Sequence, residues 1–373
     1  MKILSVVPTY YPATRYGGPI YAIKRLNELL AYDHNVSVGT TSVDGPSSTP
    51  FHFKTTNNVD IYYCHSYNRF NLYGSSELKK IIFNLAQNSD VIHAQSIFTK
   101  PLNYAFQASL KYNKPLIVSP RGMLSKYLFH LKAPIKKYLW YYLEGAKILR
   151  HASIIHVTSA IERSDAIRFG LEPNKISIIP NGVDIPSECP RQSLVETPYI
   201  LFLGRLSWKK RIDKLLSILY YLPTSIRLVV AGPAEHDTYS RLYKKAVKLH
   251  ILDRVLFVPF VSGEQKHSLL ANAKILVLPS AHENFGNVIL EAWALSTPVA
   301  VTSTVGLADY VSQYRAGIIL NGNIVCMAKQ LNHVLYNDPL RLEMGQNGYK
   351  LASTRFTWPS VVNKTSQLYG SLC

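Results

Sequence analysis

Two glutamates around a glycine–asparagine pair form the most informative segment of the chain. Glu283 and Glu291 flank Gly286 and Asn287, after an apolar run at 275–278 and at the start of an amphipathic stretch. If that stretch is a helix, its N-terminal N–H groups and dipole attract phosphate. Carboxylates on both sides suit a ligand with phosphate in the middle and hydroxyl groups at both ends, as in a nucleotide sugar. The alternative is a chance spacing of two solvated glutamates.

Two cations follow another apolar run. Gly204 comes directly after residues 199–203, and Arg205 and Lys210 follow closely. Glycine at a strand end permits close approach of a ligand to the backbone. Two cations there are suited to neutralise a diphosphate leaving group without a metal ion. A solvated basic helix start is the alternative, but it leaves Arg205 unexplained.

A glycine pair lies near the N-terminus. Gly17 and Gly18 follow the apolar run 3–7, and their lack of side chains would let backbone amides approach phosphate or an acceptor. An ordinary loop that enters a helix at Pro19 explains the pair equally well. The spacing differs from the fingerprint Gly-x-Gly-x-x-Gly, so an NAD-dependent enzyme is not expected.

The segments that would position these residues alternate between strand and helix. Short β-branched runs and helix-length amphipathic segments succeed each other along the chain, which is typical of parallel sheets with crossover helices. The predicted fold class is therefore α/β. Strands are predicted at 3–7, 36–40, 91–93, 116–119, 154–157, 199–203, 228–231, 255–258, 275–278 and 299–302. Helices in the first half are predicted at 20–30, 78–87, 102–112, 135–149 and 161–169.

A proline-containing polar stretch at 185–198 separates the two halves. Proline removes backbone donors and disfavours regular structure, so we expect a domain boundary there. Two doubly wound units in tandem are the simplest explanation, and such sheets bind ligands at the carboxyl ends of their strands. Two domains facing each other would form a cleft for a donor and an acceptor. Paired units of this kind also occur in binding proteins, so the fold alone does not define an enzyme.

The charge of the chain indicates an anionic partner. Its 373 residues carry a formal charge of +18, and the pI is about 9.6. Nucleic acid, an anionic lipid surface and phosphorylated substrates all fit that charge. The sequence has no zinc-finger spacing, aromatic RNA-binding motif or isolated helix-turn-helix, so nucleic acid is not the expected partner.

The N-terminal run and the cysteines favour a cytoplasmic protein. The apolar run that ends at Pro8 is too short for a signal-peptide core, and no window approaches the roughly 18 apolar residues of a spanning helix. The four cysteines are widely separated, which suggests neither a zinc site nor a disulfide framework. We therefore expect no metal and no cofactor.

Several motifs occur in an order that resembles the family 4 retaining glycosyltransferases of the GT-B fold, of the polysaccharide-biosynthesis type. They span nearly the whole chain and are Gly17-Gly18, Pro180-Asn181-Gly182-Val183-Asp184, Gly204-Arg205-Leu206 with Lys210, and the segment from Glu283 to Glu291. The resemblance implies two tandem Rossmann-like doubly wound domains. Residues 1–185 would bind the acceptor and 186–356 the nucleotide sugar. A helix at 357–373 would return to the first domain.

The resemblance also implies roles for individual residues. Arg205 and Lys210 would hold the donor diphosphate and stabilise it as it departs. Glu283 would meet hydroxyl groups of the transferred sugar, and Glu291 would bind the ribose. Backbone contacts would come from the four consecutive residues Phe285, Gly286, Asn287 and Val288. Gly17 and Gly18 would also contact the donor.

The acceptor side rests on fewer residues. Arg121 follows the predicted strand 116–119 in a segment that resembles a polysaccharide-building branch of the family, and a guanidinium there suits an acceptor phosphate. Many relatives carry a histidine near this strand end, where Ser119 and Arg121 stand here. His93, at the end of 91–93, is the nearest other candidate for a catalytic and acceptor-binding residue, although a strand-end histidine is often purely structural.

The segment 126–150 mixes lysines, tyrosines and Trp140. Basic residues beside interfacial aromatics suit a helix that lies on an anionic membrane. A core helix with a charged outer face is the alternative. We favour the membrane, because many family members use lipid-linked acceptors.

The expected function is retaining, metal-independent transfer of a hexosyl group from a UDP- or GDP-sugar. The acceptor would be a saccharide, expected to be lipid-linked, in the synthesis of a bacterial-type surface polysaccharide such as O-antigen, capsule or exopolysaccharide. The protein would be cytoplasmic and peripheral on the inner face of the cell membrane, in an oligomeric state that the sequence leaves open. The rivals are a sugar-nucleotide epimerase on the same fold and a basic lipid- or nucleic-acid-binding protein.

Overall fold

The computed structural model describes residues 1–13, 17–44, 47–48, 52–66, 72–125, 134–188 and 195–373. The chain forms two compact units, each described here by itself. Unit 1 comprises Met1–Asn181 with Trp358–Cys373, and unit 2 comprises Gly182–Thr357. The first junction lies four residues before the expected boundary at 185/186, and the second lies one residue after 356/357.

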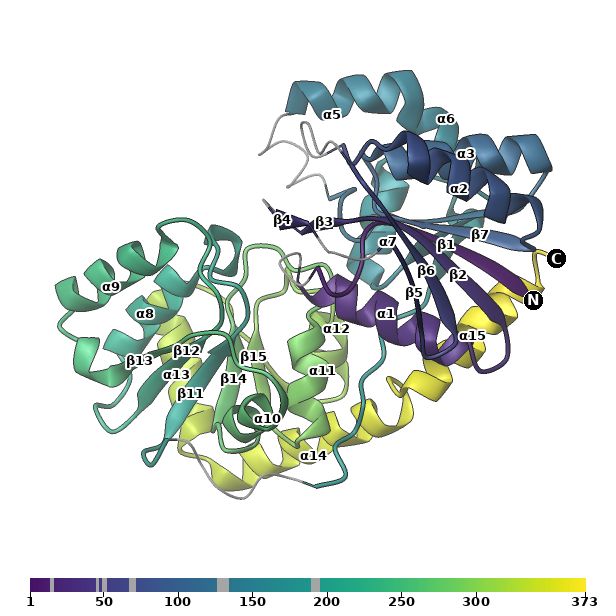
Figure 1. Ribbon diagram of the computed structural model, residues 1–373. Coiled ribbons are helices and arrows are strands. Elements are labelled where there is room, and N and C mark those ends of the chain that lie inside the picture. The colour runs from purple at the N-terminus through teal and green to yellow at the C-terminus, as the bar shows by residue number, and fades with distance from the viewer. Residues whose placement is uncertain (14–16, 45–46, 49–51, 67–71, 126–133, 189–194) are drawn as a thin grey trace. The chain divides into compact units, whose positions relative to one another are not determined.

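Unit 1 is built on a sheet with strand order β10-β9-β8-β7-β1-β2-β6-β5 (Figure 1). All its neighbouring strands pair in parallel except β5 with β6. The strands are β1 Lys2–Thr9, β2 Asn35–Thr41, β5 Phe53–Thr56, β6 Val59–Cys64, β7 Val91–Gln95, β8 Leu116–Ser119, β9 Ile154–Val157 and β10 Ile176–Ile178; a separate hairpin pairs β3 Val43–Asp44 with β4 Ser47–Ser48.

Helices cover both faces of this sheet, as Figure 1 shows. One face packs against α2, α3, α6 and α7, and the other against α1 and α15. The helices are α1 Gly18–Leu30, α2 Ser76–Gln87, α3 Lys100–Tyr112, α5 Pro134–Trp140, α6 Ala146–His151, α7 Ala160–Arg168 and α15 Trp358–Gly370, with a π-helical turn, η3 Tyr141–Gly145, and a 3-10 turn, η4 Pro173–Lys175.

Unit 2 repeats the scheme with an all-parallel sheet in the order β13-β12-β11-β14-β15-β16. Its strands are β11 Tyr199–Leu203, β12 Arg227–Ala231, β13 Val255–Val258, β14 Ile275–Leu278, β15 Val299–Val301 and β16 Gly317–Ile319. Its helices are α8 Ile212–Tyr220, α9 Thr238–Lys248, α10 Gly263–Ala271, α11 Asn287–Ala294, α12 Ala308–Gln313, α13 Ile324–Leu335 and α14 Asp338–Thr354, with 3-10 turns η5 Trp208–Lys210 and η6 Leu252–Arg254.

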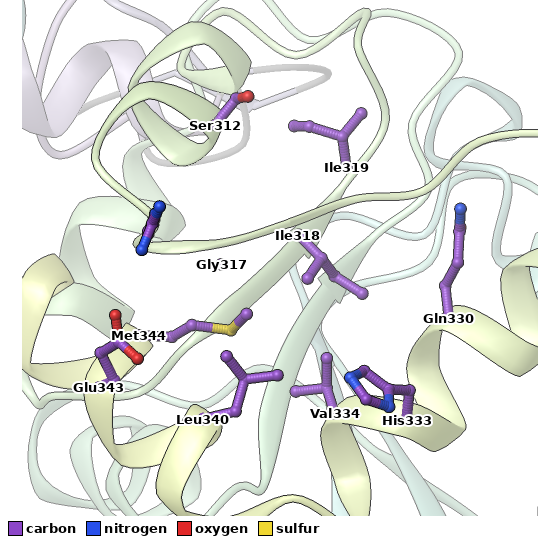
Figure 2. A pocket seen from close by; sticks show the side chains of 11 residues that line it. Ser312, Gly317, Ile318, Ile319, Gln330, His333, Val334, Leu340, Glu343 and Met344 are labelled. Carbon is purple, nitrogen blue, oxygen red and sulfur yellow. The ribbon is translucent and has the colours of Figure 1, made fainter.

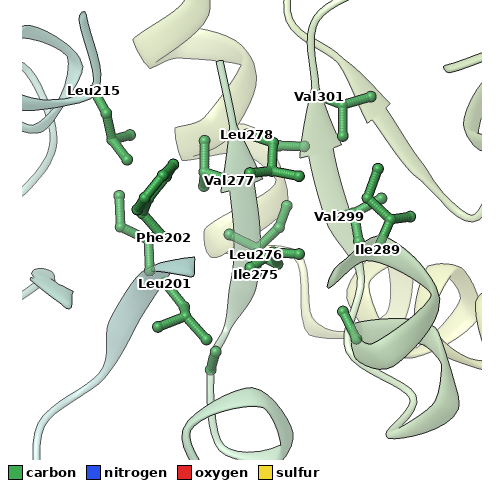
Figure 3. Close-up of a cluster of buried hydrophobic side chains, with 14 of the residues drawn as sticks. Leu201, Phe202, Leu215, Ile275, Leu276, Val277, Leu278, Ile289, Val299 and Val301 are labelled. Carbon is green, nitrogen blue, oxygen red and sulfur yellow. The ribbon is translucent and has the colours of Figure 1, made fainter. Parts of the chain in front are cut away.

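The core of unit 2 explains why its strands read as continuous apolar runs. Every residue of β14 is fully buried, and Leu201, Phe202, Val299 and Val301 on the neighbouring strands are buried with it (Figure 3). A parallel sheet with helices on both faces has no wet side, so alternation with polar residues is lost. Burying each such side chain contributes about 1.5–3 kcal/mol.

The predicted strands all occur, with ends that differ by two residues at most. The sequence prediction omitted β3, β4, β5, β6, β10 and β16. Strands β3 and β4 have two residues each, and β10 and β16 have three, too few for a periodic pattern. The helix predicted at 135–149 occurs as a continuous helical run of α5, η3 and α6, in which η3 is a π-helical turn that the sequence did not indicate.

A helix–helix contact in unit 2 depends on the absence of a side chain. Gly348 on α14 lies against the indole of Trp293 on α11, which is fully buried and donates its N–H to the carbonyl of Ala316 at 3.0 Å. A Cβ on Gly348 would overlap that indole ring. The two helices can therefore pack this closely only with glycine at 348.

Gly348→Ala is expected to destabilise unit 2 by about 1–3 kcal/mol, the usual cost of overpacking a rigid core. Thermal unfolding followed by calorimetry measures the effect. Gly370→Ala in α15 is the matched control, because a Cβ there meets no atom within 4 Å. Equal unfolding temperatures for Gly348→Ala and the wild type would contradict the argument.

Candidate active site

The winding of the unit 2 sheet reverses between β11 and β14. The chain steps outward from β11 to β12 and β13, then returns to β14 on the other side of β11. Connections on the two sides leave toward opposite faces of the sheet, and doubly wound domains bind ligands at the carboxyl ends of the two strands where the winding reverses. The loop after β11 carries Arg205 and Lys210, and the loop and helix after β14 carry Glu283 and Glu291.

Backbone bonds position Glu283. Its N–H donates to the carbonyl of Thr304 at 3.1 Å, and its carbonyl accepts the N–H of Gly306 at 2.9 Å. The residue is therefore clamped against the loop that follows β15. Gly286 ends the loop between β14 and α11 and caps that helix. Its φ of 95° is a backbone conformation that favours glycine.

Lys210 and Glu283 meet directly. The Lys210 ammonium donates to the Glu283 carboxylate, and about a fifth of each side chain is exposed. The N–H of Ala281 donates to the carbonyl of Lys209 at 2.7 Å, which ties the two loops together. The structure thus brings together a cation predicted to bind phosphate and a carboxylate predicted to bind sugar, from positions 73 residues apart.

Arg205 and Glu291 each have a partner that the sequence prediction missed. Arg205 Nη1 donates to Glu235 Oε1 at 2.9 Å, and Lys266 Nζ donates to Glu291 Oε1 at 3.0 Å. Glu235 follows the end of β12, and Lys266 lies in α10. Their places after predicted strands were a usable signal, since polar residues at the carboxyl ends of parallel strands line the binding edge of a sheet.

The remaining predicted donor contacts lie around the start of α11. Phe285 is buried against Phe356, with ring centroids 6.4 Å apart, so its side chain serves the core. Asn287 and Val288 form the first turn of the helix and are half-buried. Ile289 donates its N–H to the Gly286 carbonyl at 2.8 Å, which fixes that turn. The predicted backbone role of Phe285 is compatible with its buried ring.

Gly17 and Gly18 lie in unit 1, at the start of α1. Gly17 has φ 82° and ψ −153°, a combination that is essentially restricted to glycine. Gly18 is the first residue of the helix and is exposed. Their donor contact stays a prediction.

His93 occupies a buried hydrogen-bonded chain in unit 1. The ring is 2% exposed; its Nδ1 lies 2.7 Å from the Tyr369 hydroxyl and its Nε2 lies 2.7 Å from Ser119 Oγ. Ser119 Oγ lies 2.9 Å from His156 Nδ1, and His156 Nε2 donates to the carbonyl of Ile179 at 2.9 Å. Neutral His156 therefore accepts the Ser119 proton at Nδ1. His93 Nε2 also lies 3.1 Å from the amide nitrogen of Gln95, so the donor and acceptor roles of its two ring nitrogens depend on its tautomer.

The two imidazoles are held neutral. Burial lowers the pKa of His156 to about 3, and the charge of Arg121 adds to that effect. Burial also lowers the pKa of His93 well below its ordinary value, with help from His156 and Arg121. Because both ring nitrogens of His93 already have protein partners, its predicted contact with an acceptor would require those bonds to break. That role stays a prediction.

Arg121 lies in the loop after β8, two residues after Ser119 of this hydrogen-bonded chain. Its backbone is left-handed, with φ 53°. Its Nε donates to Gln95 Oε1 at 2.8 Å and its Nη1 to Asn181 Oδ1 at 3.2 Å. Burial lowers the pKa of Arg121, and the charge of the Glu162 carboxylate opposes this shift. The guanidinium has five N–H donors, so an anionic acceptor group could still be bound there, as predicted.

A cavity of about 540 Å³ lies elsewhere in unit 2, at the β16 edge of the sheet. Figure 2 shows apolar side chains from Ile318, Leu340 and Met344 beside the polar Gln330 and Glu343. None of its lining residues is a predicted site residue. Strand β15 separates this edge from β14, so the cavity is distinct from the loops at the switch point.

Within the described part of the chain, no group of three or more His, Cys, Asp or Glu side chains could hold a metal ion. Among the same residues, no helix is both long and apolar enough to cross a membrane. The expectation of a metal-independent reaction stays a prediction.

Two tandem doubly wound units with charged switch-point loops define a GT-B architecture, and comparison with known proteins agrees. Residues 17–186 match the model of Glycosyltransferase Family 4, and residues 190–351 match that of Glycosyl transferases group 1. The chain belongs to the group 1, family 4 glycosyltransferases. The resemblance identified from the motifs is therefore confirmed, as is the α/β fold of two tandem Rossmann-like domains.

Full-length relatives share this organisation. The chain is 26% identical to an uncharacterized glycosyltransferase, MJ1607, of Methanocaldococcus jannaschii, over 99% of this chain and 98% of that protein. The crystal structure of Anabaena HepE in complex with UDP and glucose matches with a TM-score of 0.81 at 21% identity over the whole of both chains. WaaG, a glycosyltransferase involved in lipopolysaccharide biosynthesis, matches with a TM-score of 0.72 at 18% identity over 98% of this chain and 99% of WaaG.

The buried histidines of unit 1 predict an acid-sensitive fold. Below about pH 6.5 the unfolded chain protonates His156, whereas the folded unit does not until about pH 3. The free energy of unfolding should therefore fall as the pH is lowered through this window, by about 1.4 kcal/mol per pH unit for each such histidine. Denaturant unfolding at a series of pH values measures the slope.

His156→Gln should reduce that slope, whatever its effect on stability at neutral pH. His65→Gln is the control, because His65 is an exposed histidine of the same unit. A slope that His156→Gln leaves unchanged would show that another group causes the acid sensitivity.

Proposed function

We propose that the protein is a retaining, metal-independent glycosyltransferase that moves a hexosyl group from a UDP- or GDP-sugar to a saccharide acceptor. The observation that carries the proposal is the Lys210–Glu283 pair at the unit 2 switch point, beside the N-terminus of α11. It places a cation for phosphate next to a carboxylate for sugar hydroxyls. The likeness to HepE, whose structure contains UDP and glucose, supports a nucleotide-sugar donor.

Each charged residue has a distinct task in this proposal. Arg205 and Lys210 bind the diphosphate and stabilise the negative charge that grows on it as the glycosidic bond breaks. Glu283 accepts hydrogen bonds from hydroxyl groups of the transferred sugar. Glu291 accepts those of the ribose, and Lys266 holds its carboxylate in place from 3.0 Å.

Retention of the anomeric configuration follows from attack on the face that the diphosphate leaves. A departing phosphate oxygen takes the proton of the acceptor hydroxyl while the new glycosidic bond forms, so no protein nucleophile is needed. The positive charge of Arg205 and Lys210 replaces that of a metal ion.

Donor binding should require the cations and the ribose carboxylate. Arg205→Ala and Glu291→Ala are expected to weaken binding of the cognate donor roughly 10- to 100-fold, since each removes a charge-assisted hydrogen bond. Calorimetric titration with a panel of UDP- and GDP-sugars in the presence of EDTA measures this. Arg241→Ala is the matched control, because Arg241 of α9 pairs with its near neighbour Asp237, the residue that caps this helix.

Failure of every donor to bind would remove the proposed function. If a donor binds, turnover by the wild type and by Glu283→Gln separates the remaining possibilities. A transferase should lose most of its turnover with acceptor present, an epimerase should convert the donor without any acceptor, and a binding protein should show no turnover at all.

We propose that the acceptor is lipid-linked and belongs to a surface polysaccharide, which the likeness to WaaG supports. Helix α5 and the turn η3 provide a surface for such a substrate. Trp140 anchors them to the core, with its ring centroid 4.7 Å from that of Phe98. Other large apolar side chains of the same segment are exposed to solvent, with exposed fractions of 82% for Ile135, 77% for Tyr142 and 70% for Leu143.

Exposed apolar residues on a strongly basic protein favour binding to an anionic membrane. A position on the inner face of the cell membrane would bring the transferase to a lipid-linked acceptor. Membrane binding by α5 and η3 does not depend on the donor site, so either proposal can be wrong while the other holds.

Leu139→Ser with Leu143→Ser should weaken binding to vesicles that contain phosphatidylglycerol about tenfold or more, because both side chains lose their burial in the bilayer interface. Flotation or co-sedimentation measures the binding. Leu110→Ser, on the exposed side of α3 in the same unit, is the control and should bind like the wild type. Equal binding of all three proteins would exclude this surface.

A further inference from the structure

The loops that follow β11 and β12 are joined by backbone hydrogen bonds beyond the ends of the strands. Leu206 donates its N–H to the carbonyl of Pro233 at 2.8 Å, and Glu235 donates its N–H to the carbonyl of Leu206 at 3.0 Å. A Cβ on Gly232 would overlap the Gly204 carbonyl, so the loops approach this closely only because residue 232 is glycine. The backbone itself therefore holds Glu235 beside Arg205.

The side chains complete that contact. Arg205 Nη1 lies 2.9 Å from Glu235 Oε1, with 46% and 38% of the two side chains exposed. An ion pair this accessible is screened by water and salt and contributes little to stability. A ligand with more negative charge than one carboxylate can therefore displace Glu235 from the guanidinium.

Glu235 differs from the other acids of the site in what it can offer a ligand. Under the proposed function, Glu283 and Glu291 accept hydrogen bonds from sugar and ribose hydroxyls. Glu235 pairs with Arg205, one of the two cations assigned to the diphosphate, and no sugar or ribose hydroxyl is assigned to it, so its charge only opposes that ligand. A carboxylate and a phosphate both accept hydrogen bonds from arginine, and they compete for the same donors.

We propose that Glu235 is a built-in competitor of the nucleotide diphosphate for Arg205, which weakens nucleotide binding and so speeds release of the nucleoside diphosphate product. The proposal rests on the assignment of Arg205 to the diphosphate. Product release limits the turnover of many enzymes, and an acid beside the phosphate site would shorten the lifetime of the product complex. When the product leaves, Glu235 pairs with Arg205 again.

The test is the affinity for UDP and GDP, measured by calorimetry, with dissociation rates from stopped-flow mixing. Glu235→Gln keeps the shape of the side chain and removes its charge. It is expected to tighten binding of the cognate nucleotide about 3- to 30-fold at low ionic strength, mainly through slower dissociation, with a smaller gain at high salt.

Two controls isolate the contact. Asp237→Asn removes the same charge two residues further along, where the carboxylate pairs with Arg241 at 3.0 Å, and should change affinity less than twofold. In an Arg205→Ala background, Glu235→Gln should give no gain, because the shared partner is gone.

The outcomes separate this inference from the proposed function. If the wild type binds neither UDP nor GDP, both fail. If the wild type binds and Arg205→Ala weakens binding, the site stands, and unchanged or weaker binding by Glu235→Gln overturns the competitor role in favour of a positioning role. An equal gain from Asp237→Asn also overturns it, because a general field effect would then explain the result.

Discussion

The reversal of winding between β11 and β14 is the constraint on which the candidate site depends. Parallel strands end at one edge of the sheet, so the loops after these neighbours must share a small volume. Backbone geometry then fixes their residues, since Glu283 is clamped at both its N–H and its carbonyl. The fold itself positions the charged groups, which is the condition for electrostatic stabilisation of a leaving group in the proposed reaction.

Charge pairing stabilises the cations of the candidate site. Isolated cations in half-buried loops would lose hydration without compensation. Here Lys210 pairs with Glu283, Arg205 with Glu235, and Lys266 with Glu291. These pairs are partly accessible to water, so exchanging a carboxylate partner for a phosphate costs little. The arrangement favours reversible binding over the tightest possible binding.

Unit 1 uses polar residues differently. Its strand ends carry a buried hydrogen-bond chain from Tyr369 through His93 and Ser119 to His156, whose imidazoles are kept neutral by burial. The chain connects the C-terminal helix α15 to the central strands across 276 positions of sequence. A buried network of this kind rigidifies the sheet edge that carries Arg121. The histidine that the sequence marked as a candidate base is a member of this chain, and its catalytic role stays a prediction.

The sequence by itself determined the fold class, most strands, the family and the residues at the strand ends, because apolar periodicity and glycine positions are local properties that each segment carries alone. It missed short strands such as β10 and β16, which cannot show a period, and the π-helical turn η3, in which Gly145 lies against the indole of Trp140. Only the tertiary structure decided which charges meet. Glu235 reaches Arg205 across 30 residues and Lys266 reaches Glu291 across 25, since such contacts arise from the order of strands in the sheet, which no single segment encodes.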